Sequence, residues 1–239
     1  MMNMLQACAP VAKSRPDDST LVATMGAMFT FDMIEGPQGN AKGIPTLGGT
    51  AGLLIGFAAA KLVKAVSADD SQADKVRSRI SSVPLMGGAA CLGLGLALAQ
   101  PDRAVVVVDG DASLMLELSG LATVARAKPR KFLHAVIHNG TQFTGLGNLT
   151  APAAGFDFAG AARVAGYVHA ERIDDAQVWE QRLPALLAME GPVFVELGVD
   201  PVPARTKPGF VQDEMPDRQF ERMGQEALRL QHWLRGEGV

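Results

Sequence analysis

Cysteine is scarce in this chain of 239 residues, which contains only Cys8 and Cys91. Two cysteines so far apart exclude a disulfide framework and a cysteine metal cluster, so we expect a reducing, cytoplasmic location. Positive charge is not in excess either, because the formal net charge is -3 at pH 7. The N-terminal residues lack a basic segment followed by an apolar run and a small-residue cleavage site. We therefore expect neither nucleic-acid binding nor secretion.

Two uncharged runs, 43–60 and 83–101, approach the length of a membrane span. Both are rich in glycine and alanine, which let a helix lie close to a sheet, so we interpret them as core helices of a protein without a membrane segment. The two runs share a pattern of proline, glycine and alanine at a constant offset of 39 residues. A pattern that recurs only once (the echo, below) is better explained by shared packing demands of two helices than by a repeat array.

Short apolar runs, separated by helical patterns, predict an α/β fold. With 48% hydrophobic residues the chain can bury one sizeable core. We predict buried strands at Thr20–Thr24, Ala104–Val108, Phe132–Ile137 and Pro192–Val199. We predict helices at Leu114–Ala127, Phe158–Val164, Val178–Met189 (which Pro184 could interrupt) and Met215–Leu234. The polar stretch Ser67–Ser82 predicts a solvated helix or loop, and Met25-Gly26 an easy chain reversal. Alternation of this kind implies a doubly wound, mainly parallel sheet with helices on both faces.

Asp111 follows a predicted strand and precedes two small residues, Ala112 and Ser113. Ligands collect where parallel strands end, because backbone N–H groups and helix dipoles there favour negative charge. A carboxylate beside a phosphate is repulsive unless a cation lies between them, and Mg²⁺ prefers oxygen ligands. Asn139 ends the next predicted strand, 28 residues later, and can supply a second oxygen. The loop Gly140–Phe143 would add backbone groups around the same ion.

The run Asp109-Gly110-Asp111-Ala112-Ser113, followed by His138-Asn139-Gly140, resembles the Gly-Asp-Gly to Asn signature of thiamine-diphosphate enzymes. The resemblance implies a thiamine-diphosphate-binding fold and Mg²⁺ held by Asp111, Asn139 and the backbone carbonyl of Thr141. It implies further cofactor contacts from Pro84, Met86, Gly87, Gly110, Ala112, Ser113, Gly140, Gln142 and Phe143. Met86 would be the bulky apolar residue beneath the bent thiamine. Ala112 replaces the usual second glycine, and relatives often carry an aromatic residue one position before Phe143.

The resemblance is to the diphosphate-binding half of these enzymes, and it is closest to the beta subunit of two-chain sulfopyruvate and phosphonopyruvate decarboxylases. It implies one domain over 1–203, with an atypical insertion at about 43–81, and a C-terminal connector and helix over 204–239. The family's activating glutamate would come from a separate pyrimidine-binding subunit, in a hetero-oligomer of α2β2 type or larger acting on a small 2-oxo acid. Alternatives are an acetolactate-type carboligase subunit and a non-catalytic scaffold or regulatory subunit.

Each candidate residue also has a purely structural interpretation. Asp109 and Asp111 could be helix-capping carboxylates, and Met86 could be an ordinary core methionine, with Leu47 a more distant rival for its role. His134 and His138 could both be structural, although His138 adjoins Asn139 and could reach a substrate.

Overall fold

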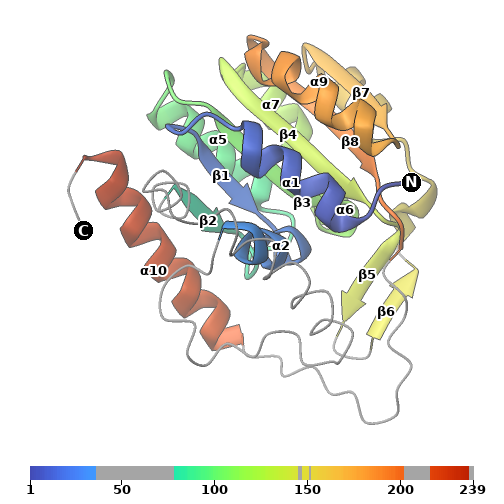
Figure 1. The fold of residues 1–239 in the computed structure, drawn as a ribbon, viewed down its shortest axis with the longest axis horizontal. Helices are drawn as coiled ribbons and strands as arrows, with labels where there is room; N and C mark the ends of the chain where they lie inside the picture. The colour runs from blue at the N-terminus through green and yellow to red at the C-terminus, as the bar shows by residue number, and fades with distance from the viewer. Residues whose placement is uncertain (36–77, 145–146, 151, 202–215, 237–239) are drawn as a thin grey trace.

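The computed structural model describes residues 1–35, 78–144, 147–150, 152–201 and 216–236, which form a sheet covered by helices on both faces (Figure 1). The sheet has six parallel strands in the order β2-β1-β3-β4-β8-β7. Their bounds are β1 Thr20–Ala23, β2 Arg79–Ser81, β3 Val105–Gly110, β4 Lys131–His138, β7 His169–Ile173 and β8 Gly191–Gly198. An antiparallel hairpin, β5 Thr141–Thr144 and β6 Gly147–Thr150, leaves the carboxyl end of β4. The predicted α/β, parallel, doubly wound architecture is confirmed.

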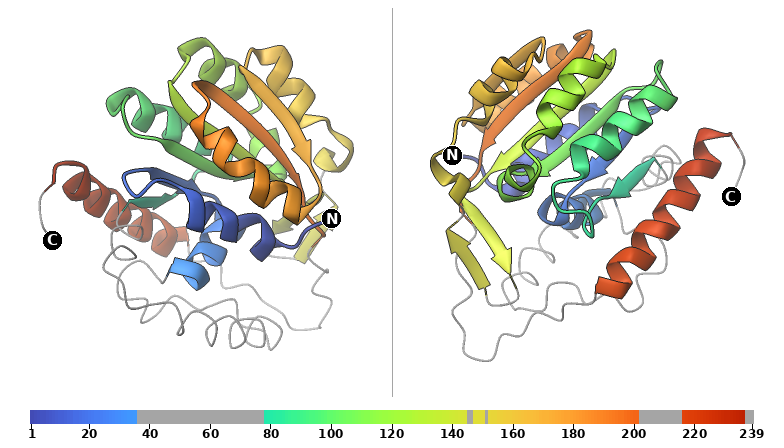
Figure 2. Two further views of the ribbon diagram at one scale, coloured as in Figure 1. Left: turned by 45° about the horizontal axis from the view of Figure 1, so that its top comes forward. Right: turned by 180° about the vertical axis from the view of Figure 1, so that it is seen from behind.

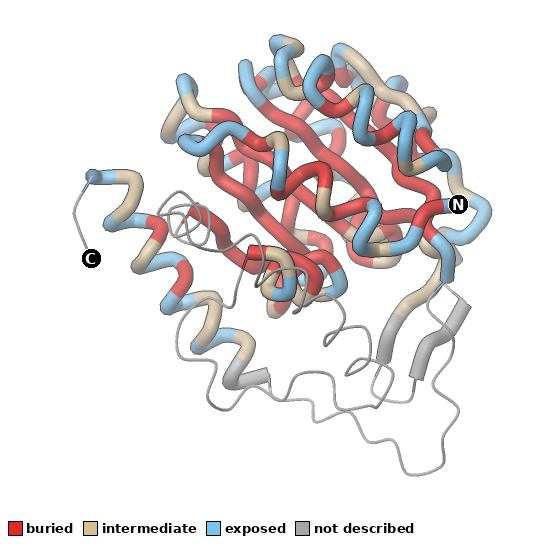
Figure 3. Tube along the Cα trace, in the orientation of Figure 1, coloured by how far each residue is buried: buried red, intermediate tan, exposed pale blue. Residues whose placement is uncertain are grey.

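The central strands form because their side chains are apolar on both faces of the sheet. The four valines of β3 are at most 1% exposed, as expected for a parallel strand covered on both faces. The buried strands form the middle of the molecule in Figure 3, and most of the exposed residues lie in the helices and loops around them.

One face of the sheet packs against α1 (Met4–Ser14), α2 (Met25–Glu35) and α9 (Ala176–Ala188). The other face packs against α5 (Ala89–Ala99), α6 (Asp111–Leu116), α7 (Gly120–Ala127) and α8 (Phe158–Ala165) (Figure 2). The last helix, α10 (Pro216–Leu234), lies along the β2 edge and contributes Leu230 to the second core. A 3₁₀ turn, η1 (Pro152–Gly155), links the hairpin region to α8.

The small residues of α5 allow close packing against the sheet, as predicted. A Cβ atom added to Gly93 would lie 2.5 Å from a methyl carbon of Val107 on β3, so only glycine permits this approach. Among the described residues, no helix is long and apolar enough to cross a bilayer. The matching run at 43–60, and with it the echo, lies outside the described residues.

Several predicted elements need correction. The single helix expected over Leu114–Ala127 is two helices, α6 and α7, because the chain turns at 117–119. Residues 78–82 are buried and include strand β2, although a solvated helix or loop was expected for Ser67–Ser82. Pro184 does not interrupt α9, which continues to Ala188. Four further features were not predicted from the sequence: α1, α2, β7 and the β5–β6 hairpin.

The domain boundaries remain a prediction. The proposed insertion at about 43–81 lies mostly outside the described residues, but its last three residues form β2 within the sheet. The predicted C-terminal segment 204–239 contains α10. This helix begins at Pro216, close to the predicted start at Met215, and ends at Leu234.

Candidate functional site

Asp111 and Asn139 follow the carboxyl ends of two neighbouring strands. β3 and β4 are parallel, with Gly110 paired to Ile137 in register. Asp111 comes directly after β3 as the first residue of α6, and Asn139 comes directly after β4. The two predicted oxygen ligands therefore lie at the same edge of the sheet.

The Asp111 carboxylate is 2% exposed and connects the two strand ends. Its Oδ1 accepts a hydrogen bond from the Ala112 backbone N–H at 2.7 Å, and its Oδ2 accepts one from the Gly140 N–H, also at 2.7 Å. Burial raises the pKa of Asp111 above its ordinary value, and these N–H donors and nearby His138 only partly offset the effect. A bound cation would stabilise such a desolvated carboxylate. The capping interpretation is wrong, since the N-cap of α6 is Gly110 and no side-chain cap is present there.

The Asn139 amide oxygen points into its own loop. It accepts hydrogen bonds from the Thr141 backbone N–H at 2.9 Å and from the Thr141 hydroxyl at 3.0 Å. These two donors occupy both lone pairs of the oxygen. The hydroxyl can rotate, so Asn139 could exchange that donor for a metal ion. The predicted ligands are the Asp111 carboxylate, the Asn139 amide oxygen and the Thr141 backbone carbonyl. All three supply oxygen atoms, which Mg²⁺ prefers.

The Pro84–Gly87 turn lies beside α6. The Gly87 N–H donates a hydrogen bond to the Ser113 hydroxyl oxygen at 3.0 Å. Gly87 has φ +86°, and a Cβ atom there would lie 2.8 Å from the Cβ of Glu117, so the turn requires glycine. Met86 is 52% exposed, which shows that the core-methionine interpretation is wrong. Its rival Leu47 lies outside the described residues.

His138 is buried and hydrogen-bonded, rather than open to the surface. Its Nδ1 lies 2.7 Å from Glu196 Oε1, and its Nε2 lies 3.2 Å from the Ala154 carbonyl oxygen and 4.0 Å from Asp111 Oδ2. The hydrogen bond to Glu196 raises the pKa of His138, although burial opposes that rise. Burial by itself would raise the pKa of Glu196, but hydrogen bonds from His138 and the Ala159 N–H hold it below its ordinary value.

Glu196 and its partner Arg172 were not predicted from the sequence as site residues. Glu196 is 0% exposed on β8, and Arg172 on β7 donates to its Oε1 at 2.6 Å. The available clue was a glutamate inside the apolar run Val193-Phe-Val-Glu-Leu197, because a buried charge requires a partner.

A second buried acid–histidine pair, Asp109 and His134, lies further into the sheet, a few residues earlier along β3 and β4. Asp109 Oδ1 accepts a hydrogen bond from the Gly110 N–H, while Asp109 Oδ2 lies 3.6 Å from His134 Nε2. Neither Asp109 Oδ2 nor His134 Nε2 has a hydrogen-bond partner among the described residues. The other ring nitrogen of His134 lies 3.3 Å from the Tyr167 hydroxyl. His134 is thus part of the core.

The remaining predicted contacts lie on β5. Thr141 and Gln142 are half-buried, and Thr141 contacts Asn139 as described above. The side chain of Phe143 lies outside the described residues.

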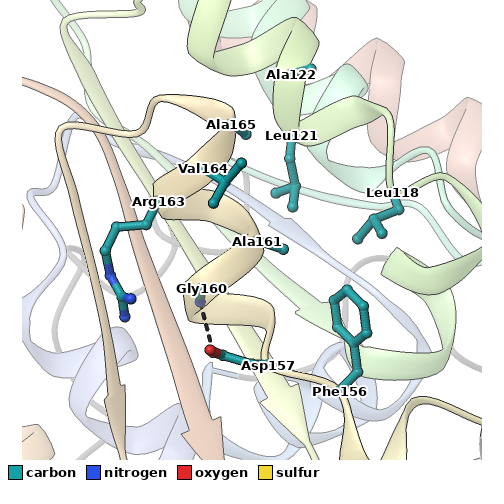
Figure 4. Close-up of a pocket in the computed structure, with 10 residues that line it drawn as sticks. All are labelled: Leu118, Leu121, Ala122, Phe156, Asp157, Gly160, Ala161, Arg163, Val164 and Ala165. Atoms are coloured by element: carbon teal, nitrogen blue, oxygen red, sulfur yellow. Dashed lines mark hydrogen bonds between the residues drawn. The ribbon is translucent and has the colours of Figure 1, made fainter.

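An open, largely apolar cavity of about 830 Å³ lies between α7 and α8, lined by residues such as Leu121, Phe156 and Val164 (Figure 4). It contains none of the predicted site residues. The polar groups predicted to bind a diphosphate and a metal ion lie at the ends of β3 and β4 and not in this cavity.

Comparison with known protein families identifies the domain. The family model described as thiamine pyrophosphate enzyme, C-terminal TPP binding domain, matches residues 67–197, more than half of the chain. The chain belongs to this family. The matched range includes both strand ends and the Pro84–Gly87 turn, which confirms the resemblance drawn from the sequence. That Asp111, Asn139 and the other named residues contact the cofactor remains a prediction.

Similar proteins include two phosphonopyruvate decarboxylases. The protein from Streptomyces viridochromogenes is 41% identical over 99 residues, which cover 40% of this chain and 24% of the relative. The one from Streptomyces hygroscopicus is 40% identical over the same length and the same shares. The matches thus span about a quarter of the length of these relatives. Among solved structures, a thiamine diphosphate-dependent 4-hydroxybenzoylformate decarboxylase from Rhodococcus jostii RHA1 superposes with a TM-score of 0.55 at 17% identity, covering 84% of this chain and 33% of that one. That likeness supports the fold.

Proposed function

We propose that this chain binds the diphosphate and Mg²⁺ of thiamine diphosphate as one subunit of a 2-oxo acid decarboxylase. The observation that supports this most is the 2.7 Å hydrogen bond from the Gly140 N–H to Asp111 Oδ2, which brings two strand ends and their oxygen ligands together. Asp111, Asn139 and the Thr141 carbonyl would hold the metal ion. Gly110, Ala112, Ser113 and Gly140 would surround the diphosphate, and exposed Met86 would contact the thiamine.

When bound, the thiazolium supplies the electron sink for loss of CO₂ from a 2-oxo acid. The similarity to phosphonopyruvate decarboxylases supports a small 2-oxo acid as the substrate. The protein's own residues would anchor and orient the cofactor at the carboxyl edge of the sheet. A cytoplasmic location and the absence of a nucleic-acid partner remain predictions from composition.

A separate pyrimidine-binding subunit would supply the activating glutamate in a hetero-oligomer of α2β2 type or larger. One observation supports this part of the proposal. The described residues build one six-stranded sheet and a small hairpin, with no second sheet of comparable size among them.

Thermal unfolding with thiamine diphosphate and Mg²⁺, added together and singly, tests the cofactor site. A ligand present at about 100 times its Kd stabilises a protein by about 2.7 kcal/mol, which gives a measurable rise in Tm. We expect this rise for the wild type and for Asp102→Ala, whose exposed side chain lies 3.6 Å from Arg130 away from the site. We expect none for Asp111→Ala.

Mixing the chain with candidate pyrimidine-binding subunits tests the reaction. CO₂ release from a 2-oxo acid that needs both chains, Mg²⁺ and the cofactor supports the decarboxylase. Formation of a carbon–carbon bond instead indicates the carboligase, and a wild type without any cofactor-dependent rise in Tm indicates a scaffold.

A further inference from the structure

Glu196 connects four segments around the end of β4. Its Oε1 accepts hydrogen bonds from His138 Nδ1 at 2.7 Å and Arg172 Nη1 at 2.6 Å, and its Oε2 accepts one from the Ala159 N–H at 2.9 Å. These donors belong to β4, β7 and the first turn of α8. A fully buried carboxylate with three donors is held firmly, because each charge-assisted hydrogen bond restricts its position.

His138 extends this connection toward the candidate metal site. Its imidazole has Glu196 on one side and the Ala154 carbonyl and the Asp111 carboxylate on the other. The ring of Phe158, at the start of α8, packs edge-on against it with 5.3 Å between ring centroids. The ring is thus held by contacts on several sides. His138 directly precedes Asn139 and Gly140, so its position fixes where β4 ends.

We propose that Glu196, acting through His138, is the positioning residue that holds the Asp111 and Asn139 oxygens in the arrangement that binds Mg²⁺ and the diphosphate. The inference rests on the proposed function. It assigns His138 a role in shaping the site in place of contact with a substrate. Groups that orient metal ligands from behind commonly contribute a factor of about 10–100 to metal affinity.

Arg172 has a smaller role in the same arrangement. Its side chain is 43% exposed and also pairs with Asp174, so solvent can partly replace it. Changing Arg172 should therefore weaken the site less than changing Glu196, and the variant should fold normally.

Isothermal titration of the full chain with thiamine diphosphate, with Mg²⁺ or with EDTA, measures the effect. We expect Glu196→Gln to raise the Kd in Mg²⁺ by about 10–100-fold, and Arg172→Gln to raise it by a smaller factor. With EDTA the variants and the wild type should differ little, because the positioned groups are the metal ligands. A merely structural role would not produce this dependence on Mg²⁺.

Two matched controls separate local from general effects. Glu35→Gln removes another buried carboxylate that is paired with arginines, Arg15 and Arg79, near the amino ends of β1 and β2. Arg182→Gln removes an arginine whose side chain is 42% exposed and pairs with Glu171 on β7. Both controls should keep the wild-type Kd.

The double variant Glu196→Gln/His138→Gln tests whether Glu196 acts through His138. Residues of one network are non-additive, so we expect its Kd to match that of the weaker-binding single variant. Full additivity of the two effects would overturn the proposal.

Other outcomes distinguish this inference from the proposed function. A folded Glu196→Gln variant with the wild-type Kd in Mg²⁺ overturns the inference and leaves the proposed function standing. If Glu196→Gln does not fold, wild-type affinity in both Arg172→Gln and His138→Gln overturns it instead. A wild-type chain without Mg²⁺-dependent binding contradicts the proposed function and the inference together.

Discussion

Two largely buried ionic clusters lie at different places along the sheet and differ in their balance of charge. The edge cluster beside β2 pairs three arginines with three acids: Arg15, Arg79, Arg222, Asp32, Glu35 and Glu226. The site cluster at the carboxyl ends of β3, β4 and β8 contains Asp111, His138, Arg172 and Glu196. In the edge cluster every acid lies within 3.1 Å of an arginine nitrogen.

Asp111 differs, because the hydrogen bonds described for it come from backbone N–H groups and its oxygen lies 4.0 Å from His138. Burial raises the pKa of Asp111, whereas the partners of Glu196 lower the pKa of that group. The edge cluster is thus electrostatically complete within the chain, while the site cluster contains one carboxylate that a cation would stabilise. This difference is consistent with a structural role for the first cluster and with the binding role proposed for the second.

The largest effect on stability is expected in the edge cluster. Glu35→Ala would leave the guanidinium groups of Arg15 and Arg79 without a buried carboxylate that contacts both. Breaking a buried pair on one side costs about 3–5 kcal/mol. Chemical denaturation should show this loss. The rise in free energy of unfolding on adding cofactor and Mg²⁺ should stay as in the wild type, and its disappearance would contradict the division between the clusters.

The next effect concerns binding and not folding. Asn139→Ala should leave the unfolding of the ligand-free chain nearly unchanged, because Asn139 is half-buried and bonds within its own loop. The stabilisation of about 2.7 kcal/mol that ligand at 100 times Kd gives should be largely lost. Thermal unfolding with and without Mg²⁺ and cofactor measures both quantities. The control is Gln177→Ala, which removes an exposed amide side chain on α9 and should behave as the wild type.

The smallest effect is a pH dependence within the site cluster. The folded-state pKa of Glu196 lies below its ordinary value of 4.5, so its hydrogen bonds stabilise the fold fully above about pH 4.5. This contribution is lost as the pH falls through the folded-state pKa. Glu196→Gln keeps a neutral acceptor but loses the charge, so it should lower stability by about 1 kcal/mol near neutral pH, and the gap to the wild type should narrow below pH 4.5. Thermal unfolding from pH 7 to pH 3 follows the gap, and a gap that widens in acid would contradict this assignment.

Asp111 should show the opposite sign. Its folded-state pKa lies above the ordinary value of 3.8, so its ionisation costs stability as the pH rises from 3.8 through the folded-state value. Bound Mg²⁺ would reverse this cost.

The sequence alone determined the apolar strands β1, β3, β4 and β8, and it placed the two predicted oxygen ligands at the ends of β3 and β4. Runs such as Val105–Val108 reveal strands because burial on both faces needs apolar residues at every position. The spacing of Asp111 and Asn139 leaves room for a helical crossover and one parallel strand, so both reach the same sheet edge. These features depend on neighbours along the chain, which a sequence displays directly.

Only the tertiary structure decided how distant polar residues meet. β2 has the sequence Arg-Ile-Ser. It can be buried because Asp32 and Glu35, both on α2, pair with Arg79 of this strand. The polar edge strand β7 forms by pairing with β8, and Glu196 contacts His138, 58 residues earlier in the chain, because β8 lies beside β4. Such contacts depend on the order of strands in the sheet, which local periodicity does not specify.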